Sequence, residues 1–372
     1  MDIISLDIFK EIFLLCDFLT KIRLRQISKF LLNNLHIIDF NNIEEKFLLK
    51  LNDDILKNYK FIKCLEAYGN PKIKDVSWMK NLKELNASGY NFGIKGLDLI
   101  KLNAGNNPNI NDINFMKNLN ELKASSRSGI NQIGIKGLDL IKLDASHNLK
   151  IKDVNWMLNL KELDASENCG IDQIGIKGLN LIKLRAWHNI KIKDVSWIEN
   201  LKELDASWDS GIDQFGIKGI DLIKLDVWDN SKIRNVSWME NLKELNACPN
   251  CGINQMGING LDLIKLTICC NPNIKDISWM KNLKELKASG YNCGIDQRGI
   301  KGLDLIVLNI FNNSKIKNVS WMKNLKELDA SLNCGINQMG INGLDLFKLT
   351  IWGNSNIKDI SWMLNLKEYT FK

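Results

Sequence analysis

A fixed spacing of hydrophobic and polar positions governs most of this chain. Four tryptophans follow one another at intervals of 41 residues, and the leucines around them recur at the same interval; they are Trp156, Trp197, Trp238 and Trp279. A fixed period of this size predicts a solenoid, in which each unit packs only on its neighbours. Residues shared by all copies build the solenoid. A function particular to this protein therefore belongs to positions where the copies differ.

Each period contains two shorter repeats. The pattern Leu-x-x-Leu-x-Ala spans residues 160–165 and returns 21 residues later, at residues 181–186. Alternating apolar and polar residues indicate a short strand with one buried face. We predict 16 parallel strands, the first near Ile62 and the last after Leu366, with 3₁₀ turns or irregular segments between them. The recurrent tryptophans are expected on the convex side, packed against the next repeat.

An asparagine follows the later copy at a constant distance. It lies five residues after the second leucine each time, at Asn70, Asn107, Asn148, Asn189, Asn230, Asn271, Asn313 and Asn354. A buried amide both donates and accepts, so stacked copies can satisfy the backbone where the chain turns. In the alternate half of the period, three copies keep an asparagine at Asn168, Asn250 and Asn333.

These residues resemble the leucine-rich-repeat family, whose signature is Leu-x-x-Leu-x-Leu-x-x-Asn-x-Leu. The chain is most similar to the short, internalin-like class, and the resemblance covers residues 61–372. It implies an α/β repeat fold, a leucine-rich-repeat solenoid with a curved, horseshoe-like parallel sheet and a small N-terminal helical segment.

The N-terminal residues follow a helical pattern instead. Ser5 or Asp7 can cap a first helix of about ten residues. Thr20 can cap a second helix, whose apolar positions are Ile22, Leu24, Ile27 and Leu31. Both helices would be amphipathic.

This segment resembles the F-box. Leu6, Phe18-Leu19 and Ile27-Ser28-Lys29 match the family pattern, whereas Asp7 stands where the family usually has proline. The resemblance implies residues 1–45 as an F-box-like segment, 46–60 as a helical connection or cap, and 61–372 as the solenoid. It also implies docking on the Skp-type adaptor of a cullin–RING ubiquitin ligase, through Leu6, Ile8, Phe9, Ile12, Phe13, Ile22 and Ile27. An open alternative is that the helices only cap the first edge of the solenoid.

Charge and composition exclude several other classes. The net charge of +7 comes from interleaved lysines and glutamates, which is not the footprint of a nucleic-acid-binding protein. No apolar stretch is long enough to span a membrane, and no secretory signal is recognisable. Nine cysteines without such a signal indicate reduced thiols. We therefore expect an intracellular, cytoplasmic protein (in the host cytoplasm if viral) with neither nucleic acid nor membrane as a partner.

Neither a metal site nor a catalytic site is expected. Cys248, Cys251, Cys269 and Cys270 lie on neighbouring repeats, but zinc needs four converging ligands. The three histidines lie far apart in sequence, and nothing resembles a nucleophile–base pair. We predict no cofactor and no enzymatic activity.

The variable positions after the strands predict a binding patch. Trp187, Trp208 and Trp228 fall on three consecutive strands, with charged and imidazole side chains at Arg185, His188 and Asp226. Exposed tryptophans among Arg and Asp are typical of protein-binding hot spots. The alternative is that the rings pack on one another and fill the concave groove. The leading hypothesis is a substrate-recognition adaptor that binds a target protein on this face. The other hypotheses are a non-catalytic repeat scaffold and an internalin-like surface ligand.

Overall fold

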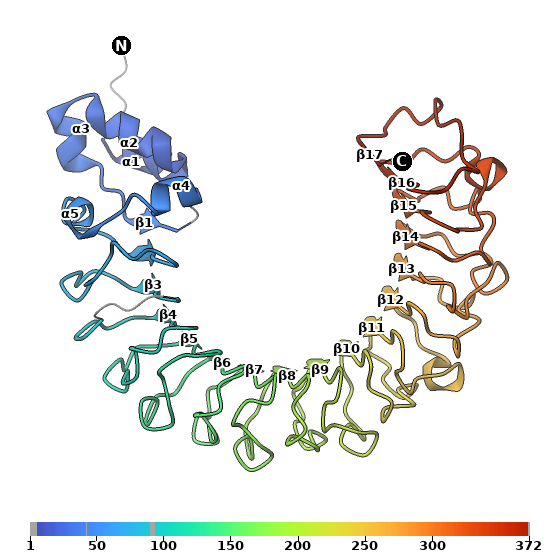
Figure 1. Cartoon of the computed structure of the whole chain (residues 1–372), viewed down its shortest axis with the longest axis horizontal. Coiled ribbons are helices and arrows are strands. Elements are labelled where there is room, and N and C mark those ends of the chain that lie inside the picture. The colour runs from blue at the N-terminus through green and yellow to red at the C-terminus, as the bar shows by residue number, and fades with distance from the viewer. Residues whose placement is uncertain (1–5, 42, 90–93, 371–372) are drawn as a thin grey trace. The chain divides into compact units, whose positions relative to one another are not determined.

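The computed structural model describes residues 6–41, 43–89 and 94–370. The chain divides into two compact units. The first comprises Met1–Asp164 with Cys169–Leu179, and the second comprises Ala165–Asn168 with Asn180–Lys372. Both units are built from short parallel strands joined by tight turns (Figure 1).

Six three-residue strands form the repeats of the first unit. They are β2 (Cys64–Glu66), β3 (Glu84–Asn86), β4 (Lys101–Asn103), β5 (Glu121–Lys123), β6 (Lys142–Asp144) and β7 (Glu162–Asp164). Each pairs in parallel with the next, and the central leucines are in register, as in Leu85↔Leu102. The central leucines are buried because strand residues alternate between the two faces.

The second unit repeats the same design with ten strands. They are β8 (Lys183–Arg185), β9 (Glu203–Asp205), β10 (Lys224–Asp226), β11 (Glu244–Asn246), β12 (Lys265–Thr267), β13 (Glu285–Lys287), β14 (Val307–Asn309), β15 (Glu327–Asp329), β16 (Lys348–Thr350) and β17 (Glu368–Thr370). Two short 3₁₀ helices, η1 (Met256–Ile258) and η2 (Gln338–Ile341), lie in its turns. The 16 strands predicted from the leucine pattern are confirmed as β2–β17, and the fold is a leucine-rich-repeat solenoid.

The asparagine ladder behaves as the sequence predicts. Asn230 is 1% exposed, and its amide donates to the carbonyl oxygens of Ala206 at 2.7 Å and Ile212 at 3.1 Å. Its Oδ1 accepts the N–H of Lys232 at 3.0 Å. The other ladder residues make the same bond to the carbonyl of an earlier turn, as Asn107, Asn148, Asn189, Asn271, Asn313 and Asn354 do.

The alternate half of the period differs from the sequence prediction. Asn168, Asn250 and Asn333 are exposed, so they are not members of a ladder. The buried place belongs to the following residue, which is a small serine or cysteine, as in Ser210 and Cys251. The strand pattern Leu-x-Ala cannot reveal this shift, because the turn in this half is one residue longer.

The recurrent tryptophans lie in the turns, and most of them donate an indole hydrogen bond to the preceding turn. Their packing against the next repeat stays a prediction. The indole N–H of Trp156 donates to Leu138 O at 3.0 Å, and that of Trp238 donates to Ile220 O at 3.1 Å, each 18 residues earlier. Trp78 and Trp197 donate instead to carbonyl oxygens three residues back.

Three short helices open the chain. They are α1 (Leu6–Leu15), α2 (Phe18–Gln26) and α3 (Lys29–Asn34). The predicted cap at Thr20 is wrong, because Asp17 caps α2 by accepting the Thr20 N–H at 2.9 Å. The predicted single second helix is interrupted, because Ser28 leaves the helical conformation and caps α3 through the Leu31 N–H at 3.1 Å. Of the two caps predicted for the first helix, Asp7 is wrong because it lies inside the first turn of α1, and Ser5 lies outside the described residues.

A two-residue strand that the pattern did not predict joins these helices to the repeats. Strand β1 (Asp39–Phe40) pairs in parallel with β2. The buried Phe40 ring contacts Phe18 of α2 at 5.3 Å and Tyr59 at 5.0 Å, both edge to face. Residues near position 40 therefore belong to the sheet of the first unit, although the F-box resemblance extends to residue 45.

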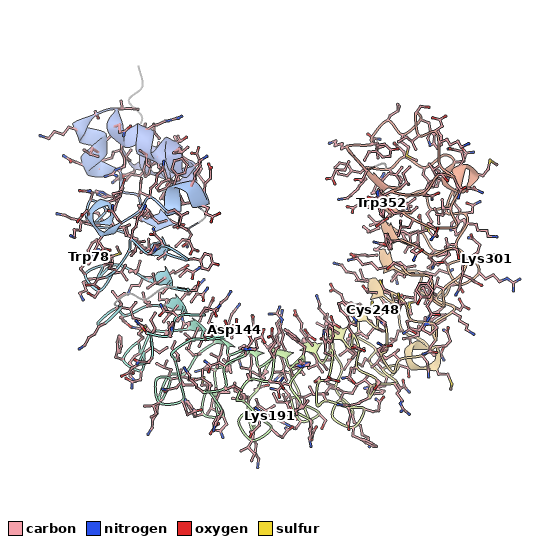
Figure 2. All side chains as sticks on the ribbon, in the orientation of Figure 1. Trp78, Asp144, Lys191, Cys248, Lys301 and Trp352 are labelled. Carbon is pink, nitrogen blue, oxygen red and sulfur yellow. The ribbon has the colours of Figure 1, made fainter. Side chains whose placement is uncertain are left out.

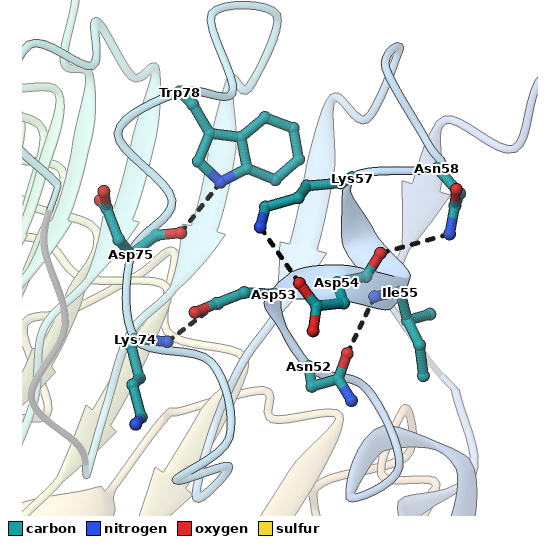
Figure 3. A network of polar contacts seen from close by, with 9 residues as sticks. All are labelled: Asn52, Asp53, Asp54, Ile55, Lys57, Asn58, Lys74, Asp75 and Trp78. Atoms are coloured by element: carbon teal, nitrogen blue, oxygen red, sulfur yellow. Dashed lines mark hydrogen bonds and ion pairs between the residues drawn. The ribbon is translucent and has the colours of Figure 1, made fainter.

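The segment after β1 is bonded to the first repeat turn. Helices α4 (Glu45–Leu48) and α5 (Asp53–Leu56) lie here. Asn70, the first ladder residue, donates to Leu48 O at 2.7 Å and Leu51 O at 3.0 Å. Asp53 accepts the Lys74 N–H at 3.0 Å (Figure 3). These bonds satisfy backbone groups that a first repeat would otherwise leave open.

Candidate protein-binding site

Two positions that follow each strand carry side chains that vary from repeat to repeat in the second unit. We call them the rim: the second and third residues beyond the strand end. After β8 they are Trp187 and His188, after β9 they are Ser207 and Trp208, and after β10 they are Trp228 and Asp229. Figure 2 labels Trp352, the corresponding residue after β16, on the strand side of this unit.

The third residue of the rim has left-handed backbone geometry. The φ angles of His188, Trp208 and Asp229 are 55°, 56° and 55°. This conformation lets the chain turn away from the strand into the repeat. Glycine occupies the corresponding place at Gly69 and Gly353. A bulky non-glycine residue in this region costs about 1–2 kcal/mol.

Trp208 and Trp228 form a pair on the rim. Their ring centroids are 5.8 Å apart, and the ring planes are inclined at 34°. The backbone N–H of Trp208 donates to the backbone carbonyl of Trp228 at 2.6 Å. The two side chains remain 44% and 42% exposed. The pairing buries only part of each ring, so a broad aromatic surface stays open to solvent.

Trp187 lies on the same rim, two strands from Trp228, and is half-buried. Among the described residues, the ring contact of this patch joins Trp208 and Trp228 alone. The structure therefore brings two of the three predicted tryptophans into contact and places the third along the same row. His188 is half-buried, and its backbone N–H donates to the backbone carbonyl of Ser207 at 3.3 Å.

Charged residues at the strand ends lie below the aromatic rim. Arg185, Asp205 and Asp226 are paired in register across β8, β9 and β10. Burial raises the pKa of Asp205, and the neighbouring charge of Asp226 raises this pKa further. Hydrogen bonds from Ser207 and, less strongly, the charge of Arg185 act in the opposite direction.

Asp226 makes hydrogen bonds within the solenoid that the sequence did not reveal. Its Oδ1 accepts the backbone N–H of Trp228 at 3.0 Å, and its Oδ2 accepts the Asn246 side-chain amide at 2.9 Å. Both carboxylate oxygens thus accept a hydrogen bond, and Asp226 fixes the backbone of Trp228. Arg185 has an exposed side chain on the strand face.

Sequence analysis overlooked Asp205 and Ser207. The Asp205 Oδ1 accepts both the N–H and the hydroxyl of Ser207, which fixes the turn that leads to Trp208. The recurring Asp-Ala-Ser sequence is the signal, because Asp144 and Ser146 make the same two bonds.

The predicted adaptor-binding residues are divided between surface and core. Ile8, Ile12 and Ile27 are 52%, 46% and 69% exposed. Leu6, Phe9 and Ile22 are half-buried. Phe13 is 2% exposed and belongs to the core of the helical segment, so it is unavailable for docking.

The described part of the chain contains neither a cluster of metal-binding side chains nor a membrane-spanning helix. No group of three or more His, Cys, Asp or Glu side chains there is placed to hold a metal ion. In residues 6–41, 43–89 and 94–370, no helix combines the length and apolar character needed to cross a bilayer.

No protein-family model and no curated protein matches the chain. Among solved structures, 22 chains match. The crystal structure of a TLR13–ssRNA13 complex is 18% identical with a TM-score of 0.45, over 83% of this chain and 52% of that one. An internalin (InlF) from Listeria monocytogenes is 16% identical with a TM-score of 0.35, over 80% of this chain and 82% of that one. The chain thus spans about half the length of the TLR13 chain.

Proposed function

We propose that this protein is a binding scaffold that holds a target protein on the rim of its second unit, around Trp208 and Trp228. The supporting observation is a pair of tryptophans that contact each other and are both more than 40% exposed. Hot spots of protein interfaces are enriched in tryptophan and arginine. Arg185 and Trp187 extend the patch along the neighbouring strand.

Other repeats have small residues at equivalent rim positions. Serine occupies the second rim position after β3, β6 and β15, at Ser88, Ser146 and Ser331. Those serines are buried or half-buried against the turn. A solenoid can turn with a small residue at the second position, so the Trp228 ring is not needed for the fold. The same holds for Trp208 at the third position, where Gly69 and Gly353 stand in other repeats.

The experiment compares proteins captured by the wild-type chain and by a double variant, Trp208→Gly with Trp228→Ala. Glycine suits position 208 because it occupies the same place at Gly69. The control is Phe215→Ala, which removes an 81% exposed ring from the turn side. We expect a target that the control retains and the double variant loses by at least about 100-fold, from two hot spots of about 2 kcal/mol each. Capture that is equal for all three proteins contradicts the proposal.

We propose a second role, as a substrate-recognition adaptor, because helix α1 exposes an apolar face. Ile8, Ile12 and Leu15 are 52%, 46% and 88% exposed, and their helical spacing places them on one side of α1. Such a face is suited to a helical partner, and the F-box resemblance suggests a Skp-type adaptor of a cullin–RING ligase. The capping role remains the alternative, supported by the Phe18–Phe40–Tyr59 contacts. Cytoplasmic location stays a prediction linked to this role.

A purified Skp-type adaptor distinguishes the two roles. We expect the wild-type chain to bind it, and Ile8→Asp with Ile12→Asp to abolish binding without lowering the melting temperature. Phe13→Asp is the contrasting variant, because a charge in the core should unfold the helical segment. A wild-type chain that does not bind the adaptor leaves the helices with the capping role only.

A further inference from the structure

A pocket lies in the first unit, where the N-terminal helices meet the segment that leads into β2. Its volume is about 420 Å³, within the range of roughly 300–1,000 Å³ that is usual for ligand pockets. Helices α2 and α3, residues 36–37 and residues 58–61 provide its lining. Neither an aspartate nor a glutamate is among the described residues that line it.

Two cationic side chains line the pocket, and neither has an ion-pair partner within the described part of the chain. The Arg25 guanidinium lies over the Tyr59 ring, with Cζ 5.2 Å from the ring centroid. Its Nη2 donates to Leu32 O at the long distance of 3.5 Å, and its buried Nε has no hydrogen-bond partner among the described residues. The other cation is the exposed Lys60. Arginine has five N–H donors, so most of those of Arg25 are left for an acceptor in the pocket.

An aromatic pair also lines the pocket. The ring centroids of His36 and Phe61 are 4.3 Å apart, with the planes inclined at 37°, and Phe61 is 47% exposed. Burial lowers the pKa of His36, and the charges of Arg25 and Lys10 lower this pKa further. The imidazole is therefore neutral at pH 7 and can donate one N–H. The same positive charges attract an anion.

We propose that this pocket binds a phosphate monoester, with Arg25 and Lys60 contacting the phosphate and the His36–Phe61 pair contacting the group that bears it. Arginine offers paired N–H groups to an oxyanion, and lysine adds a point charge. A phosphate monoester carries a charge of about −1.5 to −2 at pH 7, which two cations balance. A carboxylate carries only one negative charge and would leave one cation unbalanced.

The first test titrates the full chain with phenyl phosphate, which joins a phosphate to an aromatic ring. Isothermal titration calorimetry at pH 7, in a buffer free of phosphate, measures the Kd. We expect one site, which benzoate occupies at least about tenfold more weakly because it offers fewer charge-assisted contacts. Inorganic phosphate should also bind more weakly than phenyl phosphate, because it has no ring.

Two charge-site variants test the assignment against a matched control. Arg25→Lys keeps the charge but removes the guanidinium fork, and Lys60→Gln removes a charge from an exposed side chain. Each should weaken the binding of phenyl phosphate about tenfold. The control is Lys57→Gln, because Lys57 pairs with Asp54 at 3.1 Å and does not line the pocket (Figure 3). It should stay within about twofold of the wild type. Since the Lys60 side chain is exposed, its loss should leave the melting temperature unchanged, which separates lost binding from unfolding.

A third variant tests the aromatic pair. Phe61→Ala should weaken phenyl phosphate several-fold and leave inorganic phosphate unchanged, because only the ester has a ring to contact. A capped phosphotyrosine peptide then distinguishes two sources of the same chemistry. Binding at least as tight as that of phenyl phosphate indicates a phosphorylated protein as the ligand, and weaker binding indicates a free phosphate ester.

Two results would overturn the proposal. One is the absence of phenyl phosphate binding up to about 10 mM, far above the Kd expected of a specific site for a ligand of this size. The other is equal binding by the wild type, Arg25→Lys and Lys60→Gln. The pocket contains neither the rim tryptophans nor Ile8 and Ile12, so its failure would leave the proposed scaffold and adaptor roles untouched.

Discussion

At the scale of single residues, Trp208 shows how a repeat can be adapted for a purpose other than folding. Its backbone lies at φ 56°, where glycine stands in equivalent turns. The contact with Trp228 is worth about 0.5–1.5 kcal/mol, which is similar to the cost of the strained backbone. The net contribution of Trp208 to stability is therefore small. We infer that its exposed ring is retained for contact with another molecule.

Asp205 provides a residue-scale prediction on pH. Its folded-state pKa is raised above 3.8, chiefly by burial and then by Asp226. Protonation is therefore easier in the folded than in the unfolded chain, and the unfavourable effect of this charge is relieved as the pH falls through the raised pKa. Asp205→Asn should keep the turn, because Asn86 accepts the N–H and hydroxyl of Ser88 in the same geometry. The variant should match or exceed the melting temperature of the wild type at pH 7.

The measurement is a pair of melting curves between pH 7 and pH 4.5. The difference between the variant and the wild type should shrink toward acid, where the wild-type carboxyl becomes protonated. Asp345→Asn is a useful contrast, because hydrogen bonds from Asn365 lower the pKa of that exposed carboxyl. A wild-type chain that gains nothing relative to Asp205→Asn on acidification would show that the Asp205 charge is tolerated without cost.

At the scale of elements, the turns decide more than the strands. Each of the strands β2–β17 has three residues and a central apolar or aromatic residue, so strands alone do not distinguish one repeat from the next. The turns after them differ, and they contain the asparagine ladder in one half and small buried residues in the other. Neighbouring turns are joined by side-chain amides, so a single amide can stabilise two repeats.

Two asparagines that look alike in sequence should therefore respond differently to mutation. Asn230→Ala leaves two buried carbonyl groups and one N–H without their partner, at about 1–3 kcal/mol for each unsatisfied group. We expect a total loss of about 3–5 kcal/mol in the free energy of unfolding. Asn250→Ala removes an exposed side chain and should cost less than about 0.5 kcal/mol. Urea unfolding followed by circular dichroism measures both. Equal losses would mean that the ladder does not hold the turns together.

At the scale of the whole molecule, the sequence predicted the repeated parts better than the unique ones. The strand positions follow from leucine spacing, because burial on one face of a strand is a local, periodic requirement. The strand at Asp39–Phe40 was missed because its pairing with β2 is long-range and leaves no period. For the same reason the sequence located the three tryptophans but could not show which two of them touch. That Asp226 orients Trp228 depends on a turn geometry that only coordinates reveal.

Charge distribution over the molecule leads to a final prediction on nucleic acids. Lysines and glutamates alternate across neighbouring strands as ion pairs, such as Lys183–Glu203 at 2.6 Å and Lys224–Glu244 at 3.0 Å. Many of the basic side chains are thus interleaved with acidic ones. Asp229 belongs to the rim itself, and Asp205 and Asp226 lie at the strand ends beside it. Exposed aromatic rings can stack on unpaired bases, but this requires a basic path for the phosphates. Carboxylates at the rim would repel them.

We therefore expect single-stranded RNA and duplex DNA to bind with Kd values weaker than about 100 µM at physiological salt, the weak end of non-specific binding. Fluorescence anisotropy of labelled 20-mers measures this, and low salt provides the internal comparison, because residual attraction should disappear steeply as salt is added. Tight binding to single strands that is lost in the Trp208→Gly, Trp228→Ala chain would contradict the expectation. It would show that the tryptophan pair stacks on bases and does not dock a protein.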